Sequence, residues 1–463
     1  MPQPAFDLLR RGYLRDPDPS LAERVDRLVR LEHLLVDEAE RFVTAIDADF
    51  GGRSRTETLL ADIATTLDSV RHARRHLRGW MRPERVDPHP VFRPSRGWVE
   101  RVPKGVVGII APWNYPVNLA LGPMVAALAA GNRVLLKPSE VTPRTAALLG
   151  RALRDRFTAE EVAVVEGNAE VARAVTSLPL DHLFFTGSTA VGTLVAQAAA
   201  ASLVPVTLEL GGKSPVLVTR DAPMAHAAAR VAVGKLFNAG QTCIAPDYVL
   251  LPRGKLDVFV AAFRDAVERM GPSARQTAVI SDRAHARLLA LLAEAEAGGA
   301  TLEHVGSDGA GRRMAPVLVL HPPAHGRLLT EELFGPVLPI LEYDSLDTAI
   351  RYVQGRPRPL AFYVFEPDVR RAESLLRRVV SGGASINDTL VHFGQENLPF
   401  GGVGQSGVGA YHGRAGFDSF SHIRGVLSAS AFAPARHLLA PPYGRLLEGA
   451  LAALRGPLGR LTA

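Results

Sequence analysis

The hydrophobic positions at the start of the chain recur at helical spacing. Ser20 and Glu23 have the spacing of a capping box, in which two side chains satisfy the first free amide groups of a helix. The residues that follow predict one long amphipathic helix, through Leu21, Val25, Leu28, Leu31, Leu35, Phe42 and Ile46. Ser54 and Glu57 predict a second capping box and helix, with an apolar face at Leu60, Ile63, Leu67 and Val70. We expect both helices to be scaffold.

A proline-rich stretch separates these helices from the rest of the chain. Prolines occupy positions 83, 88, 90 and 94. Proline lacks the amide hydrogen that a helix interior needs, so residues 83–94 are expected to form an extended connection.

From Val106 the pattern changes to short apolar runs that alternate with helical runs. The expected strands cover residues 106–110, 134–136, 162–165, 182–185 and 206–208. The expected helices cover residues 118–130, 143–154, 169–176 and 188–200. This α/β alternation predicts a parallel sheet with helices on both faces, and ligands of such sheets bind beyond the carboxyl ends of the strands. The alternation resumes from Val216 to about Ile386, which predicts a second α/β domain.

The composition is that of an ordinary globular protein. The chain of 463 residues exceeds the size at which one hydrophobic core stops growing, so two or more domains are expected. No apolar run is long enough to span a membrane, and residues 1–7 lack the apolar centre of a signal peptide. The formal net charge is +6, but no nucleic-acid-binding motif accompanies the densest basic run, residues 71–101. Nucleic acid is therefore not an expected partner.

Cys243 is the only cysteine in the chain, so no internal disulfide is possible and a reducing, cytoplasmic location is expected. It follows a helical run and a Gly-Gln-Thr bend. A thiol attacks as the thiolate, and its pKa falls beside a helix terminus or a cation, so this bend suits a nucleophile. A lone cysteine can equally be a small buried hydrophobe. Two further residues favour the nucleophile: Glu209 ends a strand-like run before a Gly-Gly turn, and Asn114 lies between two prolines.

Nine segments occur in the order in which a known family carries them. They are PWNYP from Pro112, LLKPSEVTP from Leu135, FFTGSTAVG from Phe184, VTLELGGKSP from Val206, GQTCIAPDYVL from Gly240, EELFGPVLPI from Glu331, NDT from Asn387, LPFGGVGQSG from Leu398 and GAYHGRAGF from Gly409. Together they resemble the aldehyde dehydrogenase superfamily over about residues 20–445. The cysteine segment is similar to the class 3 branch, and the likeness to bacterial coniferyl aldehyde dehydrogenases is closer still.

The resemblance implies a nicotinamide dinucleotide as cofactor, with NAD preferred and NADP possible. Residues 187–192 form a Gly-x-x-x-x-Gly turn between a strand and a helix, where backbone amides and a helix N-terminus can meet a phosphate. Thr193 stands where a triphosphatase loop has lysine, and the spacing differs from the common G-x-G-x-x-G fingerprint, so the turn alone predicts only a tight bend. The implied cofactor contacts are Trp113, Lys137, Glu140, Gly187, Ser188, Gly192, Leu210, Glu332 and Phe334.

The resemblance also implies that an aldehyde is oxidised in two stages. Cys243 attacks the carbonyl carbon, and the Asn114 side chain with the Cys243 backbone N–H holds the oxyanion. Glu209 then acts as the general base for hydrolysis of the thioester. Coenzyme A acylating relatives generally lack this glutamate, so Glu209 favours hydrolysis. An ester hydrolase is the other alternative, but it needs a histidine partner, and none of the 14 histidines lies beside Cys243 in the sequence. No metal site is implied.

The aldehyde pocket is expected in neighbouring segments. By resemblance it is lined by Tyr115, Asn118, Leu119, Thr242, Ile244, residues 392–394 and His412. Aromatic and apolar walls of this kind suit an aromatic or medium-chain aliphatic aldehyde.

The resemblance divides the chain into four parts. These are a Rossmann-like dinucleotide-binding domain (1–82 and 105–209), an α/β catalytic domain (210–400), a β-arm for oligomerisation with its return segment (83–104 and 401–430) and a tail (431–463). The run 417–426 is strand-like and could pair with the arm. Because exposed strand edges are selected against, we expect a homodimer with exchanged arms, with a tetramer as the alternative. The amphipathic run 446–461 could affect either assembly.

Overall fold

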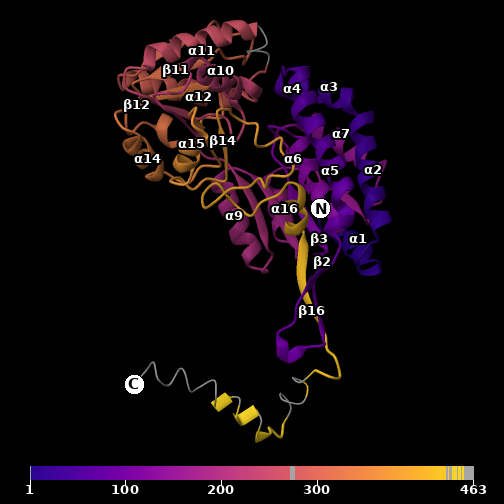
Figure 1. Cartoon of the computed structure of the whole chain (residues 1–463). Helices are drawn as coiled ribbons and strands as arrows, with labels where there is room; N and C mark the ends of the chain where they lie inside the picture. The colour runs from indigo at the N-terminus through magenta and orange to yellow at the C-terminus, as the bar shows by residue number, and fades with distance from the viewer. Residues whose placement is uncertain are drawn as a thin grey trace.

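The computed structural model describes residues 2–271 and 277–433, together with residues 436, 441–445, 447–449 and 451–452. The chain forms two α/β units, each built on its own sheet, and a small third sheet that projects away from both (Figure 1). The predicted α/β class with parallel sheets is confirmed. None of the helices in these described residues combines the length and apolarity that crossing a membrane requires.

The first unit is built on a six-stranded sheet in the order β15-β7-β6-β3-β4-β5. Its strands are β3 (Val106–Ile110), β4 (Arg133–Lys137), β5 (Val162–Val164), β6 (His182–Gly187), β7 (Val206–Leu210) and β15 (Gly407–Val408). Its connecting helices are α6 (Asn118–Ala129), α7 (Pro143–Arg154), α8 (Ala169–Thr176) and α9 (Thr189–Ala200). Only β15 is antiparallel to its neighbour. The strand order reverses between β3 and β6, and a reversal of this kind is where open α/β sheets bind ligands.

The sequence pattern predicted the elements of this unit well. Each predicted strand and helix between residues 106 and 210 agrees with the structure to within two residues at either end. The agreement follows from burial, because β3 and β4 are buried along their whole length, and β3 and the centre of β4 (134–136) therefore read as short runs without charged residues.

The second unit is built on a seven-stranded sheet in the order β10-β11-β12-β9-β8-β13-β14. Its strands are β8 (Pro215–Val218), β9 (Tyr248–Pro252), β10 (Thr301–His304), β11 (Val317–Leu320), β12 (Val337–Tyr343), β13 (Ala361–Phe365) and β14 (Gly383–Ile386). Its helices are α10 (Met224–Leu236), α11 (Leu256–Met270), α12 (Asp282–Ala297), α13 (Arg327–Thr330), α14 (Leu346–Gln354) and α15 (Val369–Leu376). The strands are parallel except for β10 at the edge.

The helices of the N-terminal part of the chain pack on both faces of the first sheet, the first helix on the opposite face from the others. They are α1 (Pro2–Arg15), α2 (Leu21–Asp37), α3 (Ala39–Phe50), α4 (Arg55–Thr58), the π-helix η1 (Leu59–Ala64) and α5 (Thr65–Trp80). The capping box at Ser20 is present in both directions. The single long helix predicted after it is wrong, because the chain turns at Glu38 into a second helix. Leu35 and Phe42, on either side of this turn, are both fully buried, so the apolar pattern continues through the break.

The second predicted capping box is only half formed. The Ser54 hydroxyl accepts from the Glu57 amide at 3.4 Å. The Glu57 carboxylate, however, accepts from the Thr277 hydroxyl at 2.7 Å and from the Asn238 amide at 3.3 Å. Glu57 therefore ties the N-terminal helices to the loop that leads to Cys243.

The third sheet is formed by β1 (Glu84–Val86), β2 (Arg96–Pro103) and β16 (Ser421–Ser428), with β2 in the middle and antiparallel pairing. A short 3-10 turn, η2 (Pro90–Phe92), interrupts the expected extended connection. The predicted strand 417–426 begins too early, because Phe417 belongs to α16 (Gly413–Ser419), where its fully buried ring packs 5.5 Å from that of Trp80. Most of the run 446–461 lies outside the described residues.

Candidate active site

The ends of β3 and β6 lie next to each other where the strand order reverses. Residues 112–114 follow β3, and β6 ends at Gly187. A Cβ atom at Gly187 would lie 2.5 Å from the Phe185 ring, so glycine lets this ring pack against the turn. The Ser188 hydroxyl caps α9 by accepting from the Val191 amide at 3.4 Å. The first turn of α9 thus offers amide groups and a helix dipole at the place where a phosphate is expected.

The loop that carries Cys243 follows α10. Asn238 and Ala239 adopt left-handed backbone angles, with φ of 53° and 52°. A Cβ atom on Gly240 would lie 2.4 Å from the carbonyl oxygen of Gly335, so glycine allows this loop to lie directly against the segment after Glu332. The loop presents Cys243, which is partly accessible, to two cavities.

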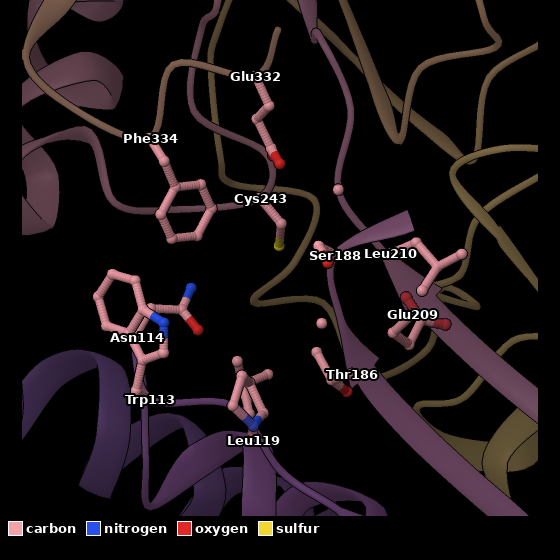
Figure 2. A pocket seen from close by; sticks show the side chains of 13 residues that line it. Trp113, Asn114, Leu119, Thr186, Ser188, Glu209, Leu210, Cys243, Glu332 and Phe334 are labelled. Carbon is pink, nitrogen blue, oxygen red and sulfur yellow. The ribbon is translucent and has the colours of Figure 1, made fainter. Parts of the chain in front are cut away.

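The first of these, which we call the cofactor cavity, has a volume of about 190 Å³. It is lined by Pro112, Trp113, Asn114, Leu119, Thr186, Gly187, Ser188, Glu209, Leu210, Gly211, Cys243, Glu332 and Phe334. Figure 2 shows the Cys243 thiol in the middle, with Asn114 and Phe334 on one side and Leu210 and Glu209 on the other. The structure therefore brings the three predicted catalytic residues together with most predicted cofactor contacts. Thr186 and Gly211 were not predicted, although each adjoins a predicted motif residue.

Glu209 and Cys243 both lie in surroundings that favour their uncharged forms. Neither carboxylate oxygen of Glu209 has a hydrogen-bond partner among the described residues, and burial raises its pKa well above the ordinary carboxyl value. Burial, together with the carboxyl groups of Glu332 and Glu209, also raises the pKa of the Cys243 thiol. The expectation that a helix end or a cation lowers the thiol pKa is therefore wrong for the chain without ligands. A bound group that carries positive charge would reverse part of this effect.

Asn114 is held in place by the Cys243 loop. It is 4% exposed, and its side-chain nitrogen donates to the carbonyl oxygen of Gln241 at 3.1 Å. This bond uses one of the two N–H groups of the amide, and the other has no acceptor in the described part of the chain. Tyr115 makes a second link, because its hydroxyl lies 2.6 Å from that of Thr242. The loop after β3 and the nucleophile loop are therefore joined at two places.

The other end of the cofactor cavity contains a carboxylate and an aromatic wall. Glu332 accepts from the Gly212 amide at 3.1 Å, and burial together with Asp247 raises its pKa to about 8. The Phe334 ring meets the Trp113 ring edge-on, with centroids 5.5 Å apart. A partly buried carboxylate that can accept from hydroxyl groups, beside a flat aromatic wall, fits a ribose and a nicotinamide ring. The residues present therefore fit a nicotinamide dinucleotide.

The remaining predicted cofactor residues lie beside this cavity rather than in it. Lys137, at the end of β4, is buried and forms an ion pair with the exposed Glu140. A Cβ atom on Gly192 would lie 2.4 Å from the Leu210 side chain, so glycine lets α9 pack against the end of β7. Lys137 ends the strand next to β3 and Glu140 follows it, which is consistent with a position at the adenosine end of a dinucleotide.

The second cavity, which we call the funnel, has a volume of about 370 Å³. It is lined by Leu60, Ala61, Thr65, Tyr115, Asn118, Leu119, Arg230, Val233, Phe237, Thr242, Cys243, Ile244, Thr389, Leu390, Val391, Phe393, Gly394 and Gln395. The predicted pocket residues Tyr115, Asn118, Leu119, Thr242 and Ile244 are all present. The contributions of the π-helix, of α10 and of residues 389–391 were missed. The spacing of Arg230 and Val233 on α10 is the one sequence signal that could have indicated a shared helix face, which Phe237 continues just after the helix.

Two histidines predicted along the pocket lie elsewhere. His392 Nδ1 is 3.0 Å from the Ser385 hydroxyl, and the His412 ring packs edge-on against Phe393 with centroids 4.9 Å apart. Burial lowers the pKa of His392 to about 4 and that of His412 to about 3, so both are neutral. Neither histidine is among the residues that line the funnel, although Phe393 and Gly394 of the predicted stretch 392–394 are, and a role for the histidines in the pocket stays a prediction.

Comparison with known proteins gives one consistent result. Residues 17–426 match the model of the aldehyde dehydrogenase family. The chain is 45% identical over 447 residues to a probable coniferyl aldehyde dehydrogenase of Pseudomonas aeruginosa, covering 96% of this chain and 94% of the relative. It is also 45% identical over 461 residues to a coniferyl aldehyde dehydrogenase of a Pseudomonas species, covering 97% of this chain and 95% of the relative.

Comparison with solved structures gives the same family. The substrate-bound structure of AldH from Staphylococcus aureus superposes with a TM-score of 0.89 at 35% identity, covering 93% of this chain and 95% of that one. A Mycobacterium tuberculosis aldehyde dehydrogenase complexed with NAD⁺ superposes with a TM-score of 0.84 at 28% identity, covering 92% and 89%. The chain therefore belongs to the aldehyde dehydrogenase family and is an NAD(P)-dependent aldehyde dehydrogenase.

Proposed function

We propose that this enzyme oxidises an aromatic aldehyde of the coniferyl type to its acid, with NAD as the preferred cofactor. The observation that carries the proposal is the funnel, a largely apolar cavity that ends at Cys243 and includes the rings of Tyr115, Phe237 and Phe393. Such walls suit an aromatic ring. The names of the relatives at 45% identity support the same substrate class. A medium-chain aliphatic aldehyde is the alternative that these walls also admit.

In this proposal Cys243 is the nucleophile and Asn114 is the oxyanion donor. The sulfur attacks the carbonyl carbon, and the thiohemiacetal oxygen accepts from the free N–H of the Asn114 amide and from the Cys243 backbone N–H. Asn114 is already fixed by its bond to Gln241, so no reorganisation is needed when charge develops on the oxygen.

The cofactor residues orient the second reactant. NAD, when bound there, would supply the acceptor for the hydride of the tetrahedral carbon. Glu332 and Phe334 would hold the nicotinamide ribose and ring, Gly187 and Ser188 the pyrophosphate, and Lys137 with Glu140 the adenosine ribose. Trp113, Leu210 and Gly192 would complete the walls around them.

Glu209 would be the general base for the water that hydrolyses the thioester. Its two oxygens have no partner among the described residues, and its raised pKa makes it a stronger base than an ordinary carboxylate. This supports hydrolysis over transfer to coenzyme A. No histidine occurs among the described residues that line either cavity, which argues against a cysteine-dependent ester hydrolase.

The same proposal extends to assembly and location. The edge strand β16 exposes Ile423 and Leu427, and a twofold homodimer would cover this edge. Light scattering is expected to give about twice the chain mass of 49.6 kDa. A stable, active monomer would contradict the dimer, and a tetramer would show a further interface.

A thiol nucleophile must stay reduced, which favours the cytoplasm as the location of the enzyme.

A panel of aldehydes tests the substrate class. Cinnamyl, benzyl and linear aliphatic aldehydes of four to twelve carbons are assayed with NAD and with NADP, and kcat/KM is compared. We expect the highest kcat/KM for the cinnamyl compounds with NAD. A maximum at a linear aldehyde would overturn the aromatic assignment and leave the reaction class intact.

A further inference from the structure

A buried ion pair lies behind the loop that carries Asn114. We call residues 112–118 the oxyanion loop. The side chains of Arg53 and Asp62 are both fully buried, with Nη2 of the arginine 3.2 Å from Oδ2 of the aspartate. Neither is among the residues that line the cofactor cavity or the funnel. Removing two charges from water is costly unless further hydrogen bonds satisfy the groups. Here such bonds satisfy most of the donors and acceptors, and Nε of Arg53 is the one atom of the pair without a partner among the described residues.

Arg53 uses its second nitrogen to hold the oxyanion loop. Nη1 donates to the carbonyl oxygen of Asn114 at 2.7 Å, and the same oxygen accepts from the Asn238 side chain at 2.9 Å. The Asn238 side chain also donates to the Gln241 carbonyl oxygen at 3.1 Å, which is the acceptor for the Asn114 amide. The result is a closed ring of hydrogen bonds through both loops.

The ring fixes which atom of the Asn114 amide faces the nucleophile loop. A carbonyl oxygen can only accept, so the nitrogen of Asn114 must lie against Gln241. An amide flipped by 180° would bring two oxygens together. Arg53, by holding the backbone carbonyl of the same residue, keeps the amide in the orientation that leaves one N–H for a substrate oxygen.

Asp62 holds the other end of the oxyanion loop. Its Oδ1 accepts from the backbone amides of Val117 at 3.0 Å and Asn118 at 3.2 Å. These amides belong to the start of α6, whose N-cap residue, Val117, has no side chain that could cap it. Asp62 therefore caps α6 although it lies far from this helix in the sequence. Arg53 binds the oxyanion loop at Asn114 and Asp62 binds it at the start of α6.

The guanidinium of Arg53 also contacts two aromatic rings. It lies 4.8 Å from the centroid of Phe50 and 5.0 Å from that of Tyr115, the residue after Asn114. The planar guanidinium, with donors on several nitrogens, can bind Asp62 and Asn114 while its face contacts the two rings. A lysine, with a compact ammonium, could not reproduce this geometry.

We propose that Arg53, supported by Asp62, is a positioning residue that orients Asn114 for the oxyanion. The inference rests on the proposed role of Asn114 itself. It predicts that removing the guanidinium group of Arg53 slows the reaction without weakening cofactor binding, because neither Arg53 nor Asp62 lines the cofactor cavity.

A double-mutant cycle tests this proposal. Arg53→Lys, which keeps the charge, and Arg53→Met are made in the native enzyme and in Asn114→Ala. Loss of one oxyanion donor typically costs about 10²–10³ in rate, and we expect Arg53→Lys to lower kcat/KM about 10-fold and Arg53→Met about 30-fold. NAD affinity, measured by quenching of protein fluorescence, should stay within about twofold. In Asn114→Ala, where the side-chain donor is already absent, the Arg53 substitutions should change kcat/KM less than about twofold.

The outcomes separate the two hypotheses. If Asn114→Ala leaves kcat/KM unchanged, the oxyanion role, and with it the proposal for Arg53, is wrong. If Asn114→Ala is slow but Arg53→Lys is not, or if the Arg53 effect is equally large in both backgrounds, Arg53 does not act through Asn114. Thermal melts identify any variant that fails to fold. If Arg53→Met does not fold, the comparison is made with Arg53→Lys alone. Arg55→Met, an exposed arginine that pairs with Glu40, is the matched control and should behave as the native enzyme.

Discussion

The cofactor cavity and the funnel meet at Cys243 and differ in their chemistry. The cofactor cavity contains two carboxyl groups, Glu209 and Glu332, and both have raised pKa values. The described residues that line the larger funnel include no carboxyl group, and most are apolar. In the proposed mechanism, the groups that move protons and bind hydroxyls therefore lie on the cofactor side of the sulfur, and the funnel binds the aldehyde.

The two cavities are also built from different kinds of structure. The cofactor cavity is formed by turns at strand ends, where Gly187 and Gly211 leave room that a Cβ atom would fill. The funnel is formed by helix faces and side chains, from η1, α10 and the segment after β14. A cavity made of side chains can change its shape by substitution without altering the backbone turns that hold a dinucleotide.

Cys243→Ala should have the largest effect, because this residue is shared by both cavities. We expect dehydrogenase activity to fall by about 10⁴-fold or more, since the thiol makes the only covalent bond to the substrate. NAD binding, followed through the fluorescence of Trp113, should be unchanged because the remaining walls of the cofactor cavity stay intact. More than trace turnover would disprove the role of Cys243 as nucleophile.

Glu209→Gln should separate the two halves of the reaction. We expect a rapid burst of NADH followed by turnover about 10²–10⁴-fold slower than native, because only thioester hydrolysis needs the base. Rapid mixing measures both phases. Equal loss of both phases would show that Glu209 activates the thiol instead.

The pH profile gives a second test of Glu209. A base must be ionised, and its pKa is raised, so native turnover should decline as pH falls through a value well above that of an ordinary carboxyl group. This acidic limb should be absent in Glu209→Gln, whose amide does not titrate. Persistence of the same limb would assign it to another group.

Glu332→Gln should affect the cofactor side alone. We expect hydride transfer to slow about 10-fold because the nicotinamide ribose loses a carboxylate acceptor, while KM for the aldehyde stays near the native value. Single-turnover formation of NADH measures the step. If NAD affinity collapses and hydride transfer is untouched, Glu332 does not position the nicotinamide half.

Glu332 also predicts a dependence of stability on pH. Its pKa is about 8 in the folded chain, above the ordinary carboxyl value. The unfolded chain therefore releases this proton more readily, and the contribution to stability is lost as pH rises towards 8. Melting temperatures of the ligand-free enzyme at pH 6 and pH 8.5 should differ less in Glu332→Gln than in the native chain. An identical difference in both would show that Glu332 does not carry this titration.

The contrast between the cavities also explains what the sequence could predict. Glu209, Asn114 and Gly187 each follow or end a buried strand, so a local pattern places them at one edge of the sheet. The π-helix η1 and Arg53 were missed because their roles depend on partners far away along the chain, such as Asn114 for Arg53. Local spacing predicted the cap at Ser54 but could not predict that the Glu57 carboxylate would bind the Asn238 amide instead. Long-range contacts of this kind depend on how the folded chain packs, and the spacing of hydrophobic positions along the sequence does not indicate them.

The smallest expected effect concerns the adenosine end of the cofactor site, where Glu140 is exposed and pairs with buried Lys137. A carboxylate that binds the ribose hydroxyls repels the 2′-phosphate of NADP. Two unit charges at 4 Å in water interact by about 1 kcal/mol, so Glu140→Gln should raise the NADP to NAD ratio of kcat/KM by about fivefold. The Lys137 ammonium, freed from its pair, adds to the change in the same direction.

Steady-state kinetics with both cofactors and one aldehyde measure the ratio. Glu170→Gln, an exposed carboxylate on α8, is the control. An unchanged ratio in Glu140→Gln would show that this carboxylate does not face the 2′ position, and selectivity would then have to come from elsewhere in the cofactor site.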